Sequence, residues 1–481
     1  MTGRVIDGRV FDAEAEARSI RDAARADAAT ARADAATARA LAERERERAA
    51  AARAEADRVR AEAGLPAGDG VVTAVVGLLC RARCAGVTVG EIVRITRGAA
   101  DLLAEVVGFR DDEVVLLPLG ELHGIAPGAA VTATGSPLTF PCGPAALGRI
   151  LDGLGQPIDG LGPVAAPPWP VERAAPPPAT RPPIVRALVT GVRSIDGFLT
   201  LGEGQRVGVF AAAGVGKSTL LAQLARTADA DVIVLGLVGE RGRELGDWLA
   251  ALGPARARTV VVCATSDAPS LVRVRAAATA TAVAESFRDA GKRVLLVVDS
   301  LTRVARAQRE VGLSAGEPPA RHGYPPSVFA LLPRLVERTG TAAAPAGSIT
   351  AVYSVLVAGD DLDEPIADEV RGIVDGHIVL DRRLAARGHF PPVDVLASVS
   401  RLFERLAPPA QREAAARVRR WLARYEEQRD LIVIGAYKAG GDRALDEAVA
   451  RQPAIEAFLR QGAEEVSSVD VTRAKLGEIS R

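Results

Sequence analysis

Near the start of the chain, small apolar and charged residues alternate without a break. Residues 9–63 contain no Gly or Pro and consist mainly of Ala, Arg, Glu and Asp, and the string ADAATAR occurs at 26–32 and again at 33–39. Because Ala, Arg and Glu favour helices, the pattern predicts one long helix of roughly 80 Å. The seven-residue period favours a thin coiled coil, and a single solvated, partly disordered helix is the alternative.

A different pattern follows the breaker-rich GLPAGDG at 64–70. From Val71 to about Val164, short runs of Val, Ile and Leu such as GEIVRI and EVVLLPL are interrupted by Gly, Asp and Pro. Short apolar runs between turn residues predict a small antiparallel β-barrel or sandwich. The Pro-rich stretch 166–183 then predicts a stiff connector.

Between about 184 and 400, apolar strand-like runs alternate with helix-like segments. RVGVFA, DVIVLGLVG, RTVVVCA, RVLLVVD and SITAVYSVL are the expected strands, with helices from Lys217 and through 271–290. The alternation predicts an α/β domain with a mainly parallel sheet. Beyond Arg401 the chain is charged, Ala-rich and expected to be helical. We therefore expect a multidomain α/β protein divided at 1–66, 67–165, 166–400 and 401–481.

Length and composition agree with several soluble domains. A chain of 481 residues exceeds a single core, and 60 Lys and Arg against 60 Asp and Glu argue against a generally basic nucleic-acid binder. Four Cys without regular spacing indicate free thiols in a reducing compartment. The N-terminus has no apolar signal-peptide core, and no apolar run approaches the roughly 18 residues of a membrane span. We expect a cytoplasmic protein, with peripheral attachment to a membrane complex left open.

The strongest local chemical signal is AAAGVGKST at 211–219, between a strand-like and a helix-like run. Backbone N–H groups at a helix N-terminus bind phosphate, and glycines let the backbone come close. Lys217 is expected to bridge the β- and γ-phosphates and Ser218 to ligate Mg²⁺. The strict motif has Gly where Ala211 stands, so the match is incomplete. The residues expected to hold ATP are Gly214, Val215, Gly216, Lys217, Ser218 and Thr219.

Two carboxylates follow buried strands and fit the same site. Asp299 ends RVLLVVD, as expected of the acid that orients Mg²⁺, and Glu240 follows VIVLGLVG. Open α/β sheets bind ligands at the carboxyl ends of their strands, where Glu240 is placed to polarise an attacking water. Arg241 has two open alternatives, contact with phosphate or pairing with a neighbouring acid.

Several long strings carry a family resemblance. They are TGVRSIDGFLTLGEGQRVGVFAAAGVGKSTLL, GERGRE, ATSDAPSLVRVRAAATATAVAE, DSLTRVARAQREVGLSAGEPPARHGYPPSVFALLPRL and GDDLDEPIADEVRGIVDGHIVL, preceded by VVLLPLGELHGIAPGAAV and LGRILDGLGQPIDG. From about 71 to 481 the chain resembles the catalytic ATPase of type III secretion systems. Flagellar export ATPases and rotary ATP synthases are more distant matches.

The resemblance implies a fold and a role for each matching residue. It implies a β-barrel, a RecA-like P-loop domain and a C-terminal helical domain around the pore of a homohexamer. Lys217 and Ser218 match the family's P-loop, Glu240 its general base, Arg241 the adjacent arginine and Asp299 its second acidic motif. Arg401, in LASVSR, matches an arginine finger that enters the neighbouring subunit's site.

The resemblance also implies partners and a location. They are ATP and Mg²⁺, stator and sorting-platform proteins, a central stalk, the export gate and chaperone–substrate complexes, at the inner-membrane secretion apparatus. FAAAGVGKST, with Ala212 where the flagellar enzyme has Gly, favours the injectisome branch, and the flagellar export ATPase is the alternative. Residues 1–66 depart from the family and resemble the start of type III stator proteins.

Two other functional classes compete with this interpretation. A RecA-type nucleic-acid translocase needs aromatic residues in its N-terminal domain to stack bases, and residues 71–164 hold only Phe109 and Phe140. A non-catalytic binding subunit of a rotary ATPase is expected to lack the lysine or glutamate of the site. Lys217 and Glu240 are both present, so we expect an ATP-hydrolysing motor of protein export that binds no nucleic acid.

Overall fold

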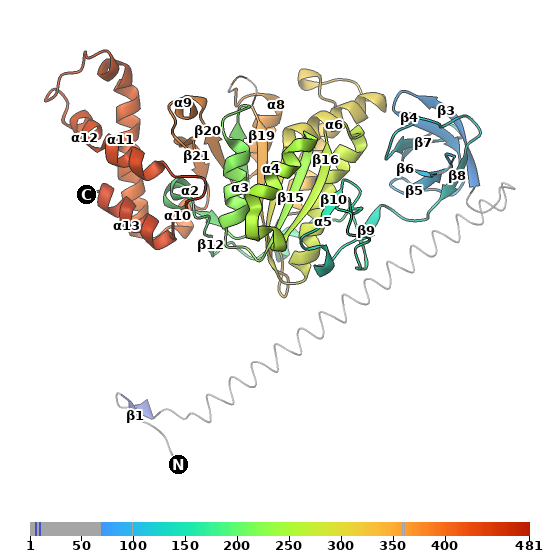
Figure 1. Cartoon of the computed structure of the whole chain (residues 1–481), viewed down its shortest axis with the longest axis horizontal. Helices are drawn as coiled ribbons and strands as arrows, with labels where there is room; N and C mark the ends of the chain where they lie inside the picture. The colour runs from blue at the N-terminus through green and yellow to red at the C-terminus, as the bar shows by residue number, and fades with distance from the viewer. Residues whose placement is uncertain (1–4, 7–8, 11–68, 99, 358, 360) are drawn as a thin grey trace.

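The computed structural model describes residues 5–6, 9–10, 69–98, 100–357, 359 and 361–481. Figure 1 shows a β-barrel at one end of the molecule, a central sheet flanked by helices, and a helical domain at the other end. The predicted fold class of barrel, nucleotide-binding α/β core and C-terminal helices is confirmed. The long helix predicted over 9–63 lies outside the described residues except at its first two positions. There the prediction is wrong, because Arg9 and Val10 form strand β2 (Arg9–Val10), which pairs with β1 (Val5–Ile6).

Six strands close into the barrel because apolar side chains alternate along them. Cys80 and Ala82 on one strand and Val93 and Ile95 on another point inward and are fully buried. The strands lie in the order β3-β4-β7-β6-β5-β8. Their bounds are β3 (Asp69–Val76), β4 (Leu79–Arg83), β5 (Ile92–Ile95), β6 (Leu102–Arg110), β7 (Glu113–Pro118) and β8 (Ala130–Ala133).

The segment after the barrel joins the central domain. Of its strands, β9 (Thr139–Pro141) pairs with β11 (Pro168–Pro170), and β10 (Ile150–Asp152) pairs with the edge of the central sheet. The barrel strands thus end at Ala133, well before the expected domain boundary at 165. Sequence pattern alone does not separate a short apolar strand of a barrel from one that extends a distant sheet.

The central sheet has nine strands, in the order β10-β16-β15-β17-β19-β14-β20-β21, with β18 on β19. All pairings are parallel except those of β18 and β21. The predicted, mainly parallel sheet is confirmed, and β15 is buried along its whole length, as a strand covered on both faces must be. The bounds are β14 (Arg206–Ala211), β15 (Val232–Glu240), β16 (Thr259–Thr265), β17 (Arg293–Asp299), β18 (Gly340–Thr341), β19 (Ser348–Leu356), β20 (Gly376–Leu380) and β21 (Val393–Ser400).

Helices cover both faces of this sheet and form two cores. One core joins α2, α3 and α4 to the C-terminal helices, and the other joins α5, α6, α7 and α8. The bounds are α2 (Arg193–Phe198), α3 (Lys217–Thr227), α4 (Gly242–Leu252), α5 (Ser270–Asp289), α6 (Leu301–Ser314), α7 (Pro326–Glu337) and α8 (Pro365–Ile373), with the short α9 (Arg382–Ala386) and α10 (Phe403–Leu406). A small pairing of β12 (Ala187–Leu188) with β13 (Leu201–Gly202) precedes β14.

The C-terminal domain consists of α11 (Pro409–Val433), α12 (Arg443–Leu459) and α13 (Val469–Ile479). Val418, Trp421 and Phe458 share a core with the face of α2 and α3. The buried Gln411 donates from its amide to the carbonyl oxygens of Asp196 (2.8 Å) and Gly197 (3.1 Å). The helical domain is therefore packed firmly on the nucleotide-binding core. Within the described ranges, no helix combines the length and apolar character needed to cross a membrane.

Candidate functional site

The P-loop joins the carboxyl end of a buried strand to the start of a helix. β14 ends at Ala211 and α3 begins at Lys217, with Gly216 at its N-cap. Gly214 and Gly216 have φ angles of +79° and +98°, which L side chains rarely adopt, so these two positions require glycine. The free N–H groups of the first turn of α3 make this loop a site for phosphate.

Lys217 lies in a buried cluster of polar groups beneath the loop. Its ammonium group forms a short ion pair with Asp299, the last residue of β17, and Lys217 and Asp299 are 8% and 1% exposed. Ser354 on β19 donates a hydrogen bond to Asp299 Oδ1 (2.5 Å) and lies 3.3 Å from Lys217 Nζ. The lysine is thereby held at the base of the phosphate loop, with an acid that balances its charge.

The donor set near Asp299 fits Mg²⁺. Asp299 Oδ2 is buried and has no hydrogen-bond partner in the described part of the chain, which leaves one carboxylate oxygen free for a ligand. Ser218, exposed in the first turn of α3, adds a hydroxyl oxygen. Across residues 69–481, masked positions aside, no three His, Cys, Asp or Glu side chains cluster as a metal site. Magnesium suits such a sparse set because it keeps water and phosphate oxygens among its ligands.

Glu240 ends β15 at a bulge created by Gly239, whose φ is +68°. The glutamate is 8% exposed, and burial together with the negative charge of Asp299 raises its pKa to about 7. The positive charges of Lys217 and Arg303 oppose that shift. Arg303 on α6 donates to Glu240 Oε2 (3.0 Å) and to the carbonyl oxygen of Gly239 (2.6 Å). A carboxylate with a pKa near neutrality is suited to general-base chemistry.

Arg241 is exposed and forms an ion pair with Glu244 at 3.3 Å. It also lines a cavity of about 440 Å³ that opens beside the P-loop residues Gly214, Ser218 and Thr219. Both alternatives weighed from the sequence thus have a structural basis, since the guanidinium pairs with an acid and borders the space next to the phosphate loop.

Phe390 was missed by the sequence analysis. A β-carbon on Gly216 would lie 3.7 Å from its ring, and the side chain is 49% exposed, so an aromatic surface stands beside the phosphate loop. The backbone N–H of Gln461 donates to the carbonyl oxygen of Phe390 (2.8 Å). An exposed aromatic ring at this place suits stacking against a nucleobase. The only sequence signal is an aromatic residue before two prolines, which has no specific meaning.

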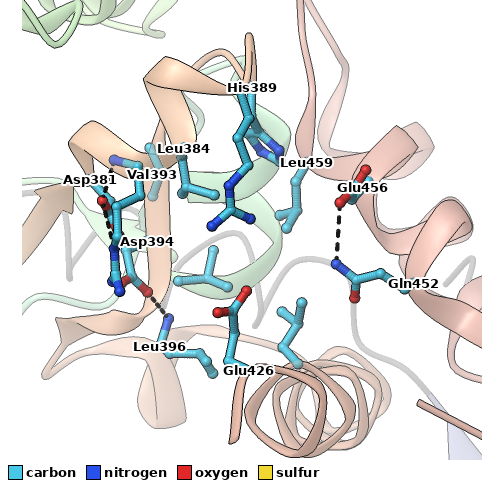
Figure 2. A pocket seen from close by; sticks show the side chains of 14 residues that line it. Asp381, Leu384, His389, Val393, Asp394, Leu396, Glu426, Gln452, Glu456 and Leu459 are labelled. Carbon is cyan, nitrogen blue, oxygen red and sulfur yellow. Dashed lines mark hydrogen bonds and ion pairs between the residues drawn. The ribbon is translucent and has the colours of Figure 1, made fainter. Parts of the chain in front are cut away.

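A cavity of about 280 Å³ lies behind the segment that carries Phe390, between the central sheet and the C-terminal domain. Figure 2 shows Asp381, His389 and Asp394 facing Glu426 and Glu456 across it. His389 is 4% exposed, and burial together with the charge of Arg460 lowers its pKa. The loop beside the nucleotide site therefore rests on C-terminal helices rather than on the sheet alone.

Arg401 lies apart from the other predicted site residues. Because β21 is antiparallel, Ser400 pairs with Gly376 at the start of β20, whereas Ala211 pairs with Leu380 at the end of β20. The length of β14 therefore separates Arg401 from its own P-loop, roughly 16 Å. Arg401 is exposed, and its guanidinium makes no hydrogen bond or ion pair with the residues that the structure describes. The structure brings Lys217, Glu240 and Asp299 together, places Ser218 next to Lys217 at the start of α3, and leaves Arg401 at the opposite edge.

Three domain families match successive parts of the chain. Residues 72–135 match the ATP synthase alpha/beta family, beta-barrel domain, and residues 191–400 match the nucleotide-binding domain of the same family. Residues 407–478 match the T3SS EscN ATPase C-terminal domain.

Curated relatives and solved structures cover most of the chain. A type 3 secretion system ATPase of Xanthomonas euvesicatoria is 50% identical over 85% of this chain and 94% of that protein. A flagellum-specific ATP synthase of Treponema pallidum is 54% identical over 82% of this chain and 89% of its own length. The assembled ATPase EscN of the enteropathogenic E. coli type III secretion system has a TM-score of 0.82 and is 43% identical, covering 86% of this chain and 100% of that chain. A structure of EscN with its central stalk EscO has a TM-score of 0.79 and is 42% identical over the same shares.

Proposed function

This chain belongs to the type III secretion ATPase family of the ATP synthase alpha/beta superfamily, and we propose that it works as the Mg²⁺-dependent homohexameric motor of a protein-export machine. It is an ATP-hydrolysing enzyme. The observation that carries the proposed mechanism is the convergence of Lys217, Asp299 and Glu240 at the carboxyl edge of the sheet, beneath the phosphate loop.

The proposed binding step uses the P-loop and its buried charges. The N–H groups of 214–219 surround the phosphates, and Lys217 moves its charge from Asp299 to the β- and γ-phosphates. Ser218 and the free oxygen of Asp299 would hold Mg²⁺, which would supply positive charge to the phosphates. The exposed ring of Phe390 stacks on the nucleobase.

The proposed hydrolytic step belongs to Glu240. Its carboxylate orients a water molecule and accepts a proton from it, which a pKa near 7 allows at physiological pH. Arg303 fixes the carboxylate by bonding to Glu240 and to the preceding carbonyl group. Arg241 lines the cavity beside the P-loop, from which its guanidinium contacts the phosphates. Arg303 therefore acts as a positioning residue and Glu240 as the base.

We place Arg401 in the site of a neighbouring subunit. An exposed guanidinium without a partner in its own described chain, one strand length from its own P-loop, is suited to a phosphate on another molecule. This arrangement makes a ring necessary for turnover, because each site takes its arginine from the next chain. The related EscN is named in its solved structure as an assembled ATPase.

The proposed partners dock away from the nucleotide. EscN has been solved with a central stalk protein, and we propose a central stalk, stator and sorting-platform proteins, the export gate and chaperone–substrate complexes for this chain. The C-terminal end of α11 offers an apolar surface for such docking, since Leu431, Val433 and Ile434 are 47%, 71% and 72% exposed. The motor would be cytoplasmic and peripheral to the inner-membrane apparatus.

The injectisome branch is the proposed assignment, and flagellar export is the alternative, because relatives of both kinds have similar identity. Ala212, buried in the P-loop, supports the injectisome. A nucleic-acid translocase is not supported, since Phe109 is the one aromatic residue on the described barrel strands and Phe140, on β9 outside the barrel, is 1% exposed. Neighbouring genes for a needle and secretin, or for flagellin and hook, discriminate the two branches.

The test of the catalytic proposal is Glu240→Gln. The amide keeps the shape of the side chain but does not accept a proton, so MgATP binding should persist while hydrolysis falls by roughly two to four powers of ten. Fluorescent-nucleotide binding and phosphate release measure the two steps. Hydrolysis by Glu240→Gln at a rate near that of the unmodified protein would show that another group is the base.

A further inference from the structure

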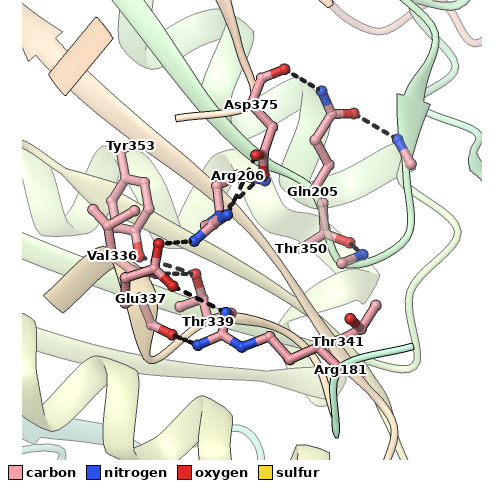
Figure 3. Close-up of polar contacts among 12 residues, drawn as sticks. Arg181, Gln205, Arg206, Val336, Glu337, Thr339, Thr341, Thr350, Tyr353 and Asp375 are labelled. Atoms are coloured by element: carbon pink, nitrogen blue, oxygen red, sulfur yellow. Dashed lines mark hydrogen bonds and ion pairs between the residues drawn. The ribbon is translucent and has the colours of Figure 1, made fainter. Parts of the chain in front are cut away.

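Gln205 joins three segments at the amino edge of the sheet, opposite the P-loop. It lies in the turn between β13 and β14 and is 0% exposed. Its amide oxygen accepts from the N–H of Gly202 (2.8 Å), and its amide nitrogen donates to the carbonyl oxygen of Asp375 (3.1 Å) and to Ser400 Oγ (3.2 Å). Figure 3 shows Gln205 extended from this turn toward Asp375. Every polar atom of the buried amide is thus satisfied, as burial requires.

The two groups that receive these bonds hold the backbone at Arg401. The N–H of Arg401 donates to the same carbonyl oxygen of Asp375 (3.0 Å), and Ser400, its neighbour, donates from Oγ to the carbonyl oxygen of Thr200 (2.9 Å). The chain passes closely here, because a β-carbon on Gly376 would lie 2.7 Å from the carbonyl oxygen of Val399. The backbone of Arg401 is therefore fixed from two sides by atoms that Gln205 contacts.

Asp375 is itself anchored by a network of charges. Its carboxylate accepts from the backbone N–H and the Nε of Arg206, both at 3.0 Å. Arg206 also donates to Glu337 (2.6 Å), and Glu337 pairs with Arg181 at 3.1 Å. Figure 3 shows these groups joined in one continuous set. The carbonyl oxygen shared by Gln205 and Arg401 thus belongs to a segment that the surrounding ion pairs hold in place.

We propose that Gln205 is a positioning residue for the arginine that completes the neighbouring subunit's site. The proposal rests on the trans role of Arg401 given above. The guanidinium of Arg401 is free, whereas its backbone is held by the hydrogen bonds that Gln205 makes to Asp375 and Ser400. The accuracy with which the guanidinium contacts a phosphate therefore depends on those bonds. A displacement of about 1 Å in a catalytic group costs up to a hundredfold in rate. Gln205 also precedes β14, which leads to its own P-loop, so an effect on its own subunit's site is the competing explanation.

Mixed rings separate these two explanations. Gln205→Leu should lower kcat by roughly ten- to a hundredfold with little change in the KM for ATP. Mixed with Lys217→Ala chains, which supply intact fingers, Gln205→Leu should regain activity. Mixed with Arg401→Ala chains, whose fingers are missing, it should not. Ser400→Ala, which removes the bond from Gln205 and the bond to Thr200 but keeps the bonds to the carbonyl oxygen of Asp375, should show the same pattern with a smaller loss.

A matched control is Thr350→Val, which removes a buried hydroxyl that accepts from Gly204 in the same turn and stands on β19, a strand that pairs with β14, β17 and β18 and not with β20 or β21. This variant should keep its kcat, with melting temperature and ring mass measured for all proteins. Recovery of Gln205→Leu with Arg401→Ala but not with Lys217→Ala would overturn the proposal in favour of an effect on its own site. Recovery with neither chain, or an unchanged kcat, would also overturn it.

The mixture of Arg401→Ala with Lys217→Ala tests the proposed function separately. Activity in that mixture together with failure of the Gln205 mixtures contradicts only the positioning role. Absence of activity in that mixture contradicts the trans role of Arg401, and the positioning role with it.

Discussion

Charged side chains have opposite environments at the two edges of the central sheet. At the carboxyl edge, Lys217, Asp299 and Glu240 are at least nine-tenths buried, and each is bonded to or influenced by the others. At the amino edge, Arg401 is exposed and held only through its backbone. Buried charges are costly unless they are paired, whereas an exposed arginine remains available to another molecule. The contrast is the basis of our proposal that the carboxyl edge forms most of one site and that Arg401 at the amino edge completes the site of a neighbouring subunit.

The largest effect that this comparison predicts is that of Lys217→Ala. It removes the charge expected on the β/γ-phosphates and leaves the buried carboxylate of Asp299 without its cation, so hydrolysis should fall by roughly ten-thousandfold or more. Phosphate release and nucleotide binding measure the loss. The exposed Lys292→Ala, outside the site, is the matched control and should leave both quantities unchanged. Substantial turnover by Lys217→Ala would contradict the assignment of the carboxyl edge as the site.

The next effect is that of Arg401→Ala at the other edge, where a loss of roughly a thousandfold in kcat is expected from removal of an arginine finger. ATP binding to the same chain should persist, because its own P-loop is intact. Arg405→Ala, also exposed in the described chain, is the control. For the unmodified protein, specific activity should rise with concentration as rings form. Constant specific activity across dilution, with a monomeric mass throughout, would contradict the proposal that Arg401 completes the site of a neighbouring subunit.

Arg303→Ala tests how Glu240 is held at the carboxyl edge. Without the bonds from Arg303 the carboxylate of Glu240 is less well positioned, so kcat should fall roughly ten- to a hundredfold. Glu240 acts as a base only when ionised, so hydrolysis should fall as pH drops through its pKa of about 7. The charge of Arg303 lowers that pKa, and its removal should therefore move the acidic limb of the pH–rate profile to higher pH. Arg306→Ala, exposed on the same helix, should leave the profile in place. If the pH–rate profile of Arg303→Ala coincides with that of the unmodified protein, Arg303 does not influence the ionisation of the catalytic base.

The smallest effect on hydrolysis is expected from deletion of residues 1–66. None of the candidate site residues at either edge lies in this segment, so basal ATPase activity should be nearly unchanged. Recruitment of stator and sorting-platform partners should be lost, as measured by pull-down and by secretion in cells. A truncated protein that secretes normally would favour a solvated extension without a partner. One that no longer hydrolyses ATP would show that the segment contributes to the ring.

Much of the site was predictable because its signals are local. The P-loop and the acids after β15 and β17 each follow from a short stretch of sequence, since a buried strand that ends in a polar residue places it at the edge of a parallel sheet. The roles predicted for these residues, and the finger role of Arg401, remain to be tested by the variants above. The change of hydrophobic pattern along the chain predicted a β-rich domain, an α/β domain and a helical domain in turn, and the family resemblance added that the first is a barrel and the second a RecA-like core.

Other features had no local signal. Phe390 beside Gly216, Arg303 on Glu240 and Ser354 on Asp299 join segments that are far apart in sequence, and each residue type is common at sites without such a role. The strand β10 was expected in the barrel and instead extends the central sheet, because its pairing with β16 depends on how the two domains meet.

The sequence by itself therefore determined which side chains are candidates for the chemistry and on which kind of element each stands, because hydrophobic period and turn residues act over a few positions. Tertiary structure alone decided which groups meet. The order of the strands and the antiparallel direction of β21 place Arg401 one strand length from its own P-loop. Gln205 acquires its bonds to Asp375 and Ser400 only when three distant segments close around it, since a hydrogen bond depends on position in space and not on separation in the chain.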